Sequence, residues 1–342
     1  MRGLLKWMLV ASSFLITAYR VQTVDAQEKL GNGSSPEFRE ELVPVEKDVK
    51  LQVLDWGGAG RPLILLAGLG YDAHEWDSFA AKLVPNYHVY AITRRGFGKS
   101  SAPQPACENY SAERLGDDVI AVMDTLKIKR PILVGHSIAG EELSSIGTRY
   151  SDKVAGLIYL DAAYAYAFFN DHGTEAEGMF DTFALRNELN AYGSPESPKE
   201  QKAQVEHLLK VSLPRYQKLL EQEEKRLQNV PDNAPGPPDT PRVRINAAIL
   251  KGFEIFGGVH CPMLAIFADP HTLPPNTPDD PTKRAAALAE DKARVSEQAD
   301  AFQAGNSSAT VIRIPNASHF VFRSNEAEVH RAIDAFVAGL PQ

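Results

Sequence analysis

The chain has 342 residues and a formal net charge of −8, and 44% of its residues are hydrophobic. This length is ample for one large core, or for a core with an inserted subdomain. Because no Lys/Arg-rich stripe accompanies the negative charge, nucleic acid and anionic membranes are poor candidates for partners.

The N-terminus has the pattern of a removable export signal over residues 1–26. Arg2 and Lys6 form a charged start, and the apolar run at 7–19 is too short for an ordinary membrane span. Small residues at 24–26 provide a cleavage site near Ala26. We therefore expect a secreted or periplasmic protein with no stable membrane insertion after cleavage, the alternative being an uncleaved anchor or a buried helix.

Residues 27–37 are polar and rich in Gly and Ser, which predicts a flexible leader before the core. In the stretch 49–56 apolar and polar residues alternate, as on a half-buried strand, whereas 63–67 is continuously apolar, as in a strand buried on both faces. Strands are predicted at 39–45, 49–56, 63–67, 88–93, 131–136 and 156–160, with helices at 77–84, 111–126 and 138–150. This alternation predicts an α/β fold with a mostly parallel sheet flanked by helices.

After Asp161 the pattern changes, and residues 162–258 contain no convincing strand. They hold two charged helices, at 199–211 and 213–229, and a proline-rich linker at 231–241. They also carry an aromatic patch of Tyr164, Tyr166, Phe168, Phe169, Phe180 and Phe183. We expect a helical cap, or alternatively a surface for docking a partner.

The sheet resumes beyond the cap with strands at 262–268 and 310–314 and helices at 281–304 and 326–340. The predicted sheet therefore has about eight strands. The core consists of a first part at 38–161 and a second part at 259–342.

The two cysteines, Cys107 and Cys261, fall at opposite ends of parallel strands, so no disulfide is expected between them. Neither their number nor their spacing supports a metal site. No metal and no organic cofactor are expected.

One short stretch, Pro131 to Gly140, organises the predicted core. An apolar run ends in Gly135-His136-Ser137, and a helix follows, which is the sequence form of a nucleophile elbow. Ala139 stands where the usual Gly-x-Ser-x-Gly pattern has its second glycine, but alanine is still small. The alternative is that Ser137 only caps a helix.

Several motifs in order resemble the α/β-hydrolase superfamily, in its serine-nucleophile branch with a helical cap. The stretch 65–70 resembles its oxyanion loop, with Ala67 in place of the usual histidine. Residues 95–100 resemble its Arg-Gly-x-Gly-x-Ser turn, with Thr93 where an aspartate is common. Residues 316–320 resemble its C-terminal histidine loop. The resemblance covers roughly 39–161 and 259–340, and it implies an α/β-hydrolase sheet and a catalytic triad.

The resemblance implies a role for each residue of the triad. Ser137 is the nucleophile and His319 its base, because a serine hydroxyl needs an adjacent base. The usual acid position after the penultimate strand holds His271, which cannot act as the acid. The family's other position holds Asp161, at the end of the strand after the elbow helix, and Asp269 is the alternative acid.

Other predicted site residues surround this triad. The oxyanion hole is expected to use the backbone N–H groups of Leu69 and Ile138. His74, Tyr164 and Phe168 are candidate substrate-pocket residues. His136 is expected to be structural. Glu141 and Glu142 are expected to complement the dipole of the elbow helix.

These features together predict an exported serine hydrolase that works through an acyl-enzyme. Its substrate would be a small molecule, namely an ester, lactone or amide of a small-to-medium, fairly apolar acid. Ser137 argues against an epoxide hydrolase or dehalogenase, which a nucleophilic aspartate would suggest. The alternatives are carbon–carbon bond hydrolysis or perhydrolase chemistry on the same triad, or a non-catalytic ligand-binding member of the fold.

Overall fold

The computed structural model describes residues 38–169, 185, 188–189, 192, 197–236, 238–275, 277 and 279–341. The predicted export signal and leader, and the aromatic residues Phe180 and Phe183, lie outside these residues. Across the described part of the chain, every helix is too short or too polar to span a membrane.

The chain divides into two compact units. The larger holds the described residues 38–169 and 240–341, and the smaller holds those between 185 and 239. The ends of the predicted cap, described at 162–169 and 240–258, thus group with the sheet.

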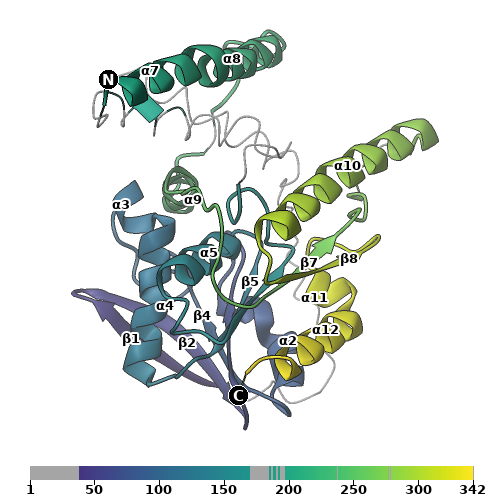
Figure 1. Cartoon of the computed structure of the whole chain (residues 1–342). Helices are drawn as coiled ribbons and strands as arrows, with labels where there is room; N and C mark the ends of the chain where they lie inside the picture. Colours follow the sequence, from purple (N-terminus) through teal and green to yellow (C-terminus); the bar gives the residue numbers. More distant parts are fainter. Residues whose placement is uncertain are drawn as a thin grey trace. The chain divides into compact units, whose positions relative to one another are not determined.

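An eight-stranded sheet forms the centre of the larger unit (Figure 1), in the order β1-β2-β4-β3-β5-β6-β7-β8. The strands are β1 Arg39–Glu46, β2 Val49–Gly57, β3 Pro62–Leu66, β4 His88–Ile92, β5 Ile132–His136, β6 Gly156–Leu160, β7 Met263–Ala268 and β8 Ala309–Ile314. The β1–β2 and β2–β4 pairs are antiparallel, and all other pairs are parallel. The predicted mostly parallel sheet of about eight strands is confirmed.

Helices cover both faces of this sheet. The helices of the larger unit are α2 Asp77–Leu83, α3 Cys107–Tyr110, α4 Ala112–Leu126, α5 Ala139–Arg149, α9 Pro241–Lys251, α10 Pro281–Gly305, α11 Val321–Ser324 and α12 Glu326–Ala338, with the 3-10 turn η2 at Ala73–Trp76. In Figure 1, α4 and α5 lie on one side of the strands and α2 and α12 on the other.

The alternating residues of the central strands divide the core into two clusters. In β3, Ile64 and Leu66 pack with α4, α5 and α10, whereas Leu63 and Leu65 pack with α2, α11 and α12. Burying both faces explains the continuous apolar runs of the inner strands. Because β3 to β8 run parallel, their carboxyl ends lie at one edge of the sheet. Ser137, Asp161 and His271 follow β5, β6 and β7 at this edge.

The smaller unit is helical over residues 198–227. It contains α7 Pro198–His207, the π-helical turn η4 Leu208–Ser212, and α8 Leu213–Leu227. The Ser197 hydroxyl accepts a hydrogen bond from the backbone N–H of Glu200 and caps α7, with Pro198 in the first turn.

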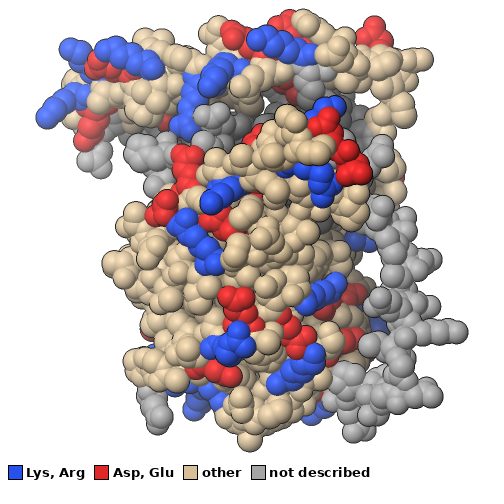
Figure 2. Space-filling model, turned by 90° about the vertical axis from the view of Figure 1, so that its right-hand side faces the viewer, with Lys and Arg blue, Asp and Glu red and all other residues tan. Residues whose placement is uncertain are grey.

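The surface carries charges of both signs. Figure 2 shows Lys and Arg side chains interspersed with Asp and Glu side chains over one face. Cys107 and Cys261 are both free thiols.

Candidate active site

Ser137 follows β5 at a sharp strand-to-helix turn. Its φ of 53° lies in the left-handed region, which is uncommon for a non-glycine residue. Its N–H donates to the carbonyl of Leu160 at the end of β6 (3.3 Å), and its carbonyl accepts from Gly140 (2.9 Å). A Cβ placed on Gly68 would lie 3.5 Å from the Ser137 Cβ, so the 67–70 loop passes directly beside the serine.

Asp161 and His319 meet at this same edge of the sheet. The His319 Nδ1 lies 2.7 Å from the Asp161 Oδ2, although 158 positions separate the two residues. The other Asp161 oxygen, Oδ1, accepts from the Tyr164 hydroxyl (2.7 Å) and from the backbone N–H of Ala268 (3.0 Å). Asp161 is fully buried and has a φ of 48°.

The charges of this pair follow from its surroundings. Burial raises the pKa of Asp161, but hydrogen bonds and charge from His271 and His319 outweigh it, so the carboxyl pKa falls well below its usual range. An ionised carboxylate only accepts hydrogen bonds, so the His319 Nδ1 must carry the proton. A neutral His319 then has its basic lone pair on Nε2, the tautomer that a general base needs.

The alternative acid, Asp269, makes different contacts. Its carboxylate accepts from the Ser296 hydroxyl at 2.8 and 3.1 Å and from the Arg313 guanidinium at 3.4 Å. The structure therefore brings Asp161, rather than Asp269, into contact with the His319 ring.

A second histidine, His271, also binds Asp161. The His271 Nε2 lies 2.8 Å from Asp161 Oδ2, and its Nδ1 lies 3.1 and 3.2 Å from the two oxygens of Asp291 on α10. The sequence analysis noted His271 only because it stands where an acid is usual, and it did not predict the contact with Asp161. Asp291 belongs to no motif, so no sequence signal identified it.

His136, the residue before Ser137, is fully buried in a polar network. Its Nδ1 lies 3.0 Å from Glu75 Oε1, and its Nε2 lies 3.1 Å from the carbonyl oxygen of His319. The other Glu75 oxygen accepts from the backbone N–H of Gly68 at 2.8 Å. This network links the loop beside Ser137 with the loop that carries His319, in keeping with the structural role expected for His136.

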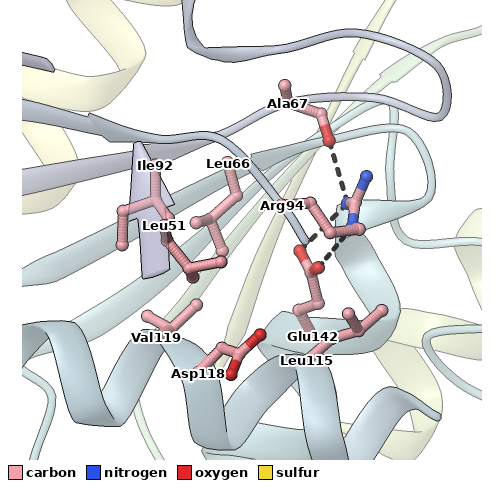
Figure 3. Close-up of a pocket in the computed structure, with 9 residues that line it drawn as sticks. All are labelled: Leu51, Leu66, Ala67, Ile92, Arg94, Leu115, Asp118, Val119 and Glu142. Atoms are coloured by element: carbon pink, nitrogen blue, oxygen red, sulfur yellow. Dashed lines mark hydrogen bonds and ion pairs between the residues drawn. The ribbon is translucent and has the colours of Figure 1, made fainter. Parts of the chain in front are cut away.

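A buried ion pair holds the same 67–70 loop from another side. The Arg94 guanidinium donates to both oxygens of Glu142, at 2.5 and 3.1 Å, and to the carbonyls of Ala67 and Gly68, at 3.0 and 3.4 Å. Figure 3 shows this pair at the wall of a small cavity. The cavity volume of about 10 Å³ is near the minimum for one water molecule, so it is no substrate pocket.

Glu141 differs from its expected role. Its carboxyl is fully buried, and neither oxygen has a hydrogen-bond partner among the described residues. Burial, and after it the neighbouring Glu142, raises its pKa well above the usual value, which favours the neutral carboxyl. A neutral carboxyl contributes no charge to the helix dipole, and Glu142 is engaged by Arg94.

The predicted pocket residues lie in three different settings. Tyr164 is buried and donates to Asp161. Phe168 lies in the core, where its ring contacts Phe302 edge to face with the ring centroids 5.9 Å apart. The His74 ring is at the surface, 3.2 Å from Asp77 and in edge contact with Phe38.

Among the described residues, one cluster has the donor set for a metal ion, namely Asp161, His271 and His319. Their ligand atoms lie within 4.8 Å of one another. However, the 2.7 and 2.8 Å distances from Asp161 Oδ2 to the two imidazoles are those of charge-assisted hydrogen bonds, which already occupy this oxygen.

Comparison with known families identifies the chain's relatives. The model of the alpha/beta hydrolase family matches residues 63–332. The chain belongs to this family. A solved structure that shares the fold is bromoperoxidase from Bacillus anthracis, with a TM-score of 0.56 and 19% identity over 88% of this chain and all of that one.

Two curated relatives are similar in sequence over part of their length. Fluoroacetate dehalogenase from Burkholderia sp is 34% identical over 34% of this chain and 38% of the relative. 2-Hydroxymuconate semialdehyde hydrolase from Pseudomonas sp. (strain CF600) is 28% identical over 46% of this chain and 59% of the relative. The matched part of the chain thus spans less than two thirds of either relative.

Proposed function

We propose that this protein is a serine hydrolase that cleaves its substrate through an acyl-enzyme on Ser137. The observation that carries the proposal is the 2.7 Å contact between His319 Nδ1 and the buried carboxylate of Asp161. This contact leaves the basic lone pair of a neutral His319 on Nε2, and it stabilises the imidazolium that forms when His319 takes a proton.

The chemistry runs in two halves. Ser137 Oγ attacks the substrate carbonyl carbon while His319 Nε2 takes the hydroxyl proton, and the backbone N–H groups of Ile138 and Leu69 bind the developing oxyanion. His319 then gives its proton to the leaving group, and an acyl-enzyme remains. A water molecule attacks the acyl carbon with His319 as base, which releases the acid and restores Ser137.

The elbow geometry supports this assignment. The left-handed conformation of Ser137 and the start of α5 directly behind it direct free N–H groups and a positive dipole end toward the oxyanion. Gly68 lies beside the serine, which supports the assignment of the Leu69 N–H, one residue further along the same loop, to the oxyanion hole. The Glu75 and Arg94 contacts on either side hold that loop.

The proposed substrate is an ester, lactone or amide of a small-to-medium organic acid. Tyr164 and Phe168 are packed in the core, so they give no support for an apolar pocket. The proposal includes export with cleavage near Ala26 and a helical cap, both of which rest on the sequence pattern.

Carbon–carbon bond hydrolysis is the second candidate, favoured by the similarity to 2-hydroxymuconate semialdehyde hydrolase. The same nucleophile, base and acid serve both reactions. Dehalogenation, named for the Burkholderia relative, is disfavoured because residue 137 is a serine and not an aspartate.

Labelling with a fluorophosphonate probe, followed by intact-mass measurement, tests the proposal. We expect one adduct on the wild type and none on Ser137→Ala. Ser318→Ala, which removes a serine next to His319, should retain the adduct. Folded wild type that takes no adduct and hydrolyses no ester would contradict the proposal. A panel of esters and β-diketones then separates ester from carbon–carbon bond cleavage.

A further inference from the structure

The loop after β7 carries His271 into contact with the proposed triad. Its backbone N–H donates to Asp291 Oδ2 at 2.7 Å, while its ring bridges Asp291 and Asp161. Backbone hydrogen bonds tie this loop to the His319 loop, from Asn316 N–H to the Pro270 carbonyl and from Thr272 N–H to the Ala317 carbonyl. His271 is therefore fixed relative to both Asp161 and His319.

The hydrogen bonds of His271 define its charge. Both ring nitrogens face carboxylate oxygens, which can only accept, so both nitrogens must carry protons and the ring is an imidazolium. Burial lowers its pKa, but Asp161 and Asp291 outweigh burial and raise the pKa to about 10. Arg294 binds the other side of Asp291 at 2.7 Å and keeps that carboxylate in place.

We propose that His271 is a positioning residue of this site: its positive charge holds Asp161 between two histidines and sets the pH at which His319 can act as a base. The inference rests on the proposed function, because it assigns His319 that role. It goes beyond a Ser-His-Asp triad by adding a second imidazole, charged at neutral pH, on the same carboxylate oxygen.

The physical reasoning concerns competition for Asp161 Oδ2. His271 and His319 both donate to this oxygen, at 2.8 and 2.7 Å, and their ring centroids lie 6.3 Å apart. A fixed positive charge at this distance disfavours a second one on His319. Burial is the main cause of the lowered pKa of His319, with His136 and His271 adding to it and the Asp161 bond opposing it.

Other charged or titratable groups also face this pair of histidines. They are Asp161 and Tyr164 at the end of β6, Asp291 and Arg294 on α10, His136 on β5, and Glu75 on η2, which acts through His136. None of these groups is itself replaced when only His271 is changed, so comparing a neutral with a cationic replacement isolates the effect of its charge.

The test is the pH dependence of fluorophosphonate labelling in His271→Gln and His271→Lys. Glutamine can still donate a hydrogen bond to Asp161 but has no charge, so the pKa of His319 should rise. We expect the acid limb of the rate profile to shift to higher pH, on the order of one pH unit. At a pH below the limb, the variant should therefore be labelled roughly tenfold more slowly than the wild type. Lysine keeps the charge, and its limb should stay near that of the wild type.

A purely structural role for His271 predicts a different result. In that case both variants lose rate uniformly, without a shift of the limb, and the proposal is wrong. Ser296→Ala serves as a matched control, because it removes another contact between α10 and the same loop, at Asp269, without changing a charge on Asp161. Its acid limb should coincide with that of the wild type.

A spectroscopic readout separates this inference from the proposed function. In protein labelled with [¹⁵N]histidine, the His271 ring nitrogens should keep imidazolium shifts above about pH 8, and His319 should titrate at higher pH in His271→Gln than in the wild type. A neutral His271 at about pH 7, or an unchanged His319 titration, would overturn the inference even if labelling succeeds. If labelling fails in the wild type but these shifts appear, only the proposed reaction is wrong. His271→Asn replaces the glutamine variant if that one does not fold.

Discussion

The Glu75 carboxylate and the His136 imidazole lie 3.0 Å apart with no exposed side-chain surface on either residue. Burial raises the pKa of Glu75, but His136 and the Gly68 N–H outweigh burial, and its net pKa falls below the usual value. Because Gly68 and the His319 carbonyl bind the outer atoms of the pair, it joins two of the loops from which the candidate site is built.

Removing Glu75 should therefore destabilise the protein strongly. Glu75→Ala leaves the His136 ring and the Gly68 N–H without their buried acceptor, and breaking one side of a buried pair costs about 3–5 kcal/mol. Urea denaturation measures the loss. Glu108→Ala, at an exposed glutamate, should change the free energy of unfolding by less than about 0.5 kcal/mol. A loss of similar size in both variants would argue against the pair.

The identity of the acid is tested by two aspartate-to-asparagine variants. Asp161→Asn removes the charge that fixes the His319 tautomer, so the rate of ester hydrolysis should fall by about 10⁴-fold. Asp269→Asn alters only the contacts with Ser296 and Arg313, and its rate should fall by less than about tenfold. Steady-state kinetics on a p-nitrophenyl ester gives both values. The opposite order would move the acid to Asp269.

Variants of the Arg94–Glu142 pair distinguish its contribution to stability from its role in positioning the 67–70 loop. Glu142→Ala strands a buried guanidinium and should cost about 3–5 kcal/mol in the free energy of unfolding. The double variant Arg94→Met with Glu142→Leu places apolar side chains of similar volume at both positions and should recover much of this loss. Because that variant also lacks the hydrogen bonds to Ala67 and Gly68, we expect its fluorophosphonate labelling to stay slow. Urea denaturation and labelling rates measure the two properties, and full recovery of both would show that Arg94 does not position the loop.

A methyl group at residue 140 tests the packing of the elbow helix. A Cβ on Gly140 would lie 1.9 Å from the carbonyl oxygen of Ala162, a backbone atom that cannot rotate away. Gly140→Ala should therefore lower the free energy of unfolding by about 1–3 kcal/mol or more. A Cβ on Gly257 would meet no heavy atom within 4 Å, so Gly257→Ala is the control. Thermal unfolding compares the two.

The raised pKa of His271 makes its contribution to stability depend on pH. The folded value is about 10 and the reference value is 6.5. The stabilisation is therefore complete below about pH 6.5 and is lost as the pH rises toward about 10. The difference in unfolding free energy between wild type and His271→Gln should shrink over this window. A difference that stays constant, or grows with pH, would mean that His271 is not held as a cation.

Local patterns in the sequence predicted most of the fold because each strand and helix carries its own periodicity. The continuous apolar run that becomes β3 and the amphipathic run that becomes α4 are of this kind. The helix α9 was not predicted. It begins at the last proline of the predicted linker, where Thr240 before Pro241 is a typical helix start, and the Thr240 hydroxyl does cap it.

The polar network of the site was predictable only in part. An apolar strand that ends in an acid pointed to Asp161, and the structure brings it to His319. The second imidazole partner of Asp161 and the carboxylate partner of His136 could not be predicted in the same way. His271 lies 110 positions from Asp161, and Glu75 lies 61 positions from His136. Such contacts depend on how the loops meet in three dimensions, so no local pattern in the sequence indicates them.

The supply of the carboxylate from β6 has a consequence for how this scaffold can change. β5 and β6 are adjacent strands, and the Ser137 N–H is bonded directly to the Leu160 carbonyl, so Ser137 and Asp161 are held by one pair of neighbouring strands. The segment after β7 therefore does not need to supply the carboxylate that contacts His319. Residues 273–275 of this segment can therefore be varied while Asp161 keeps its contacts with His271 and His319.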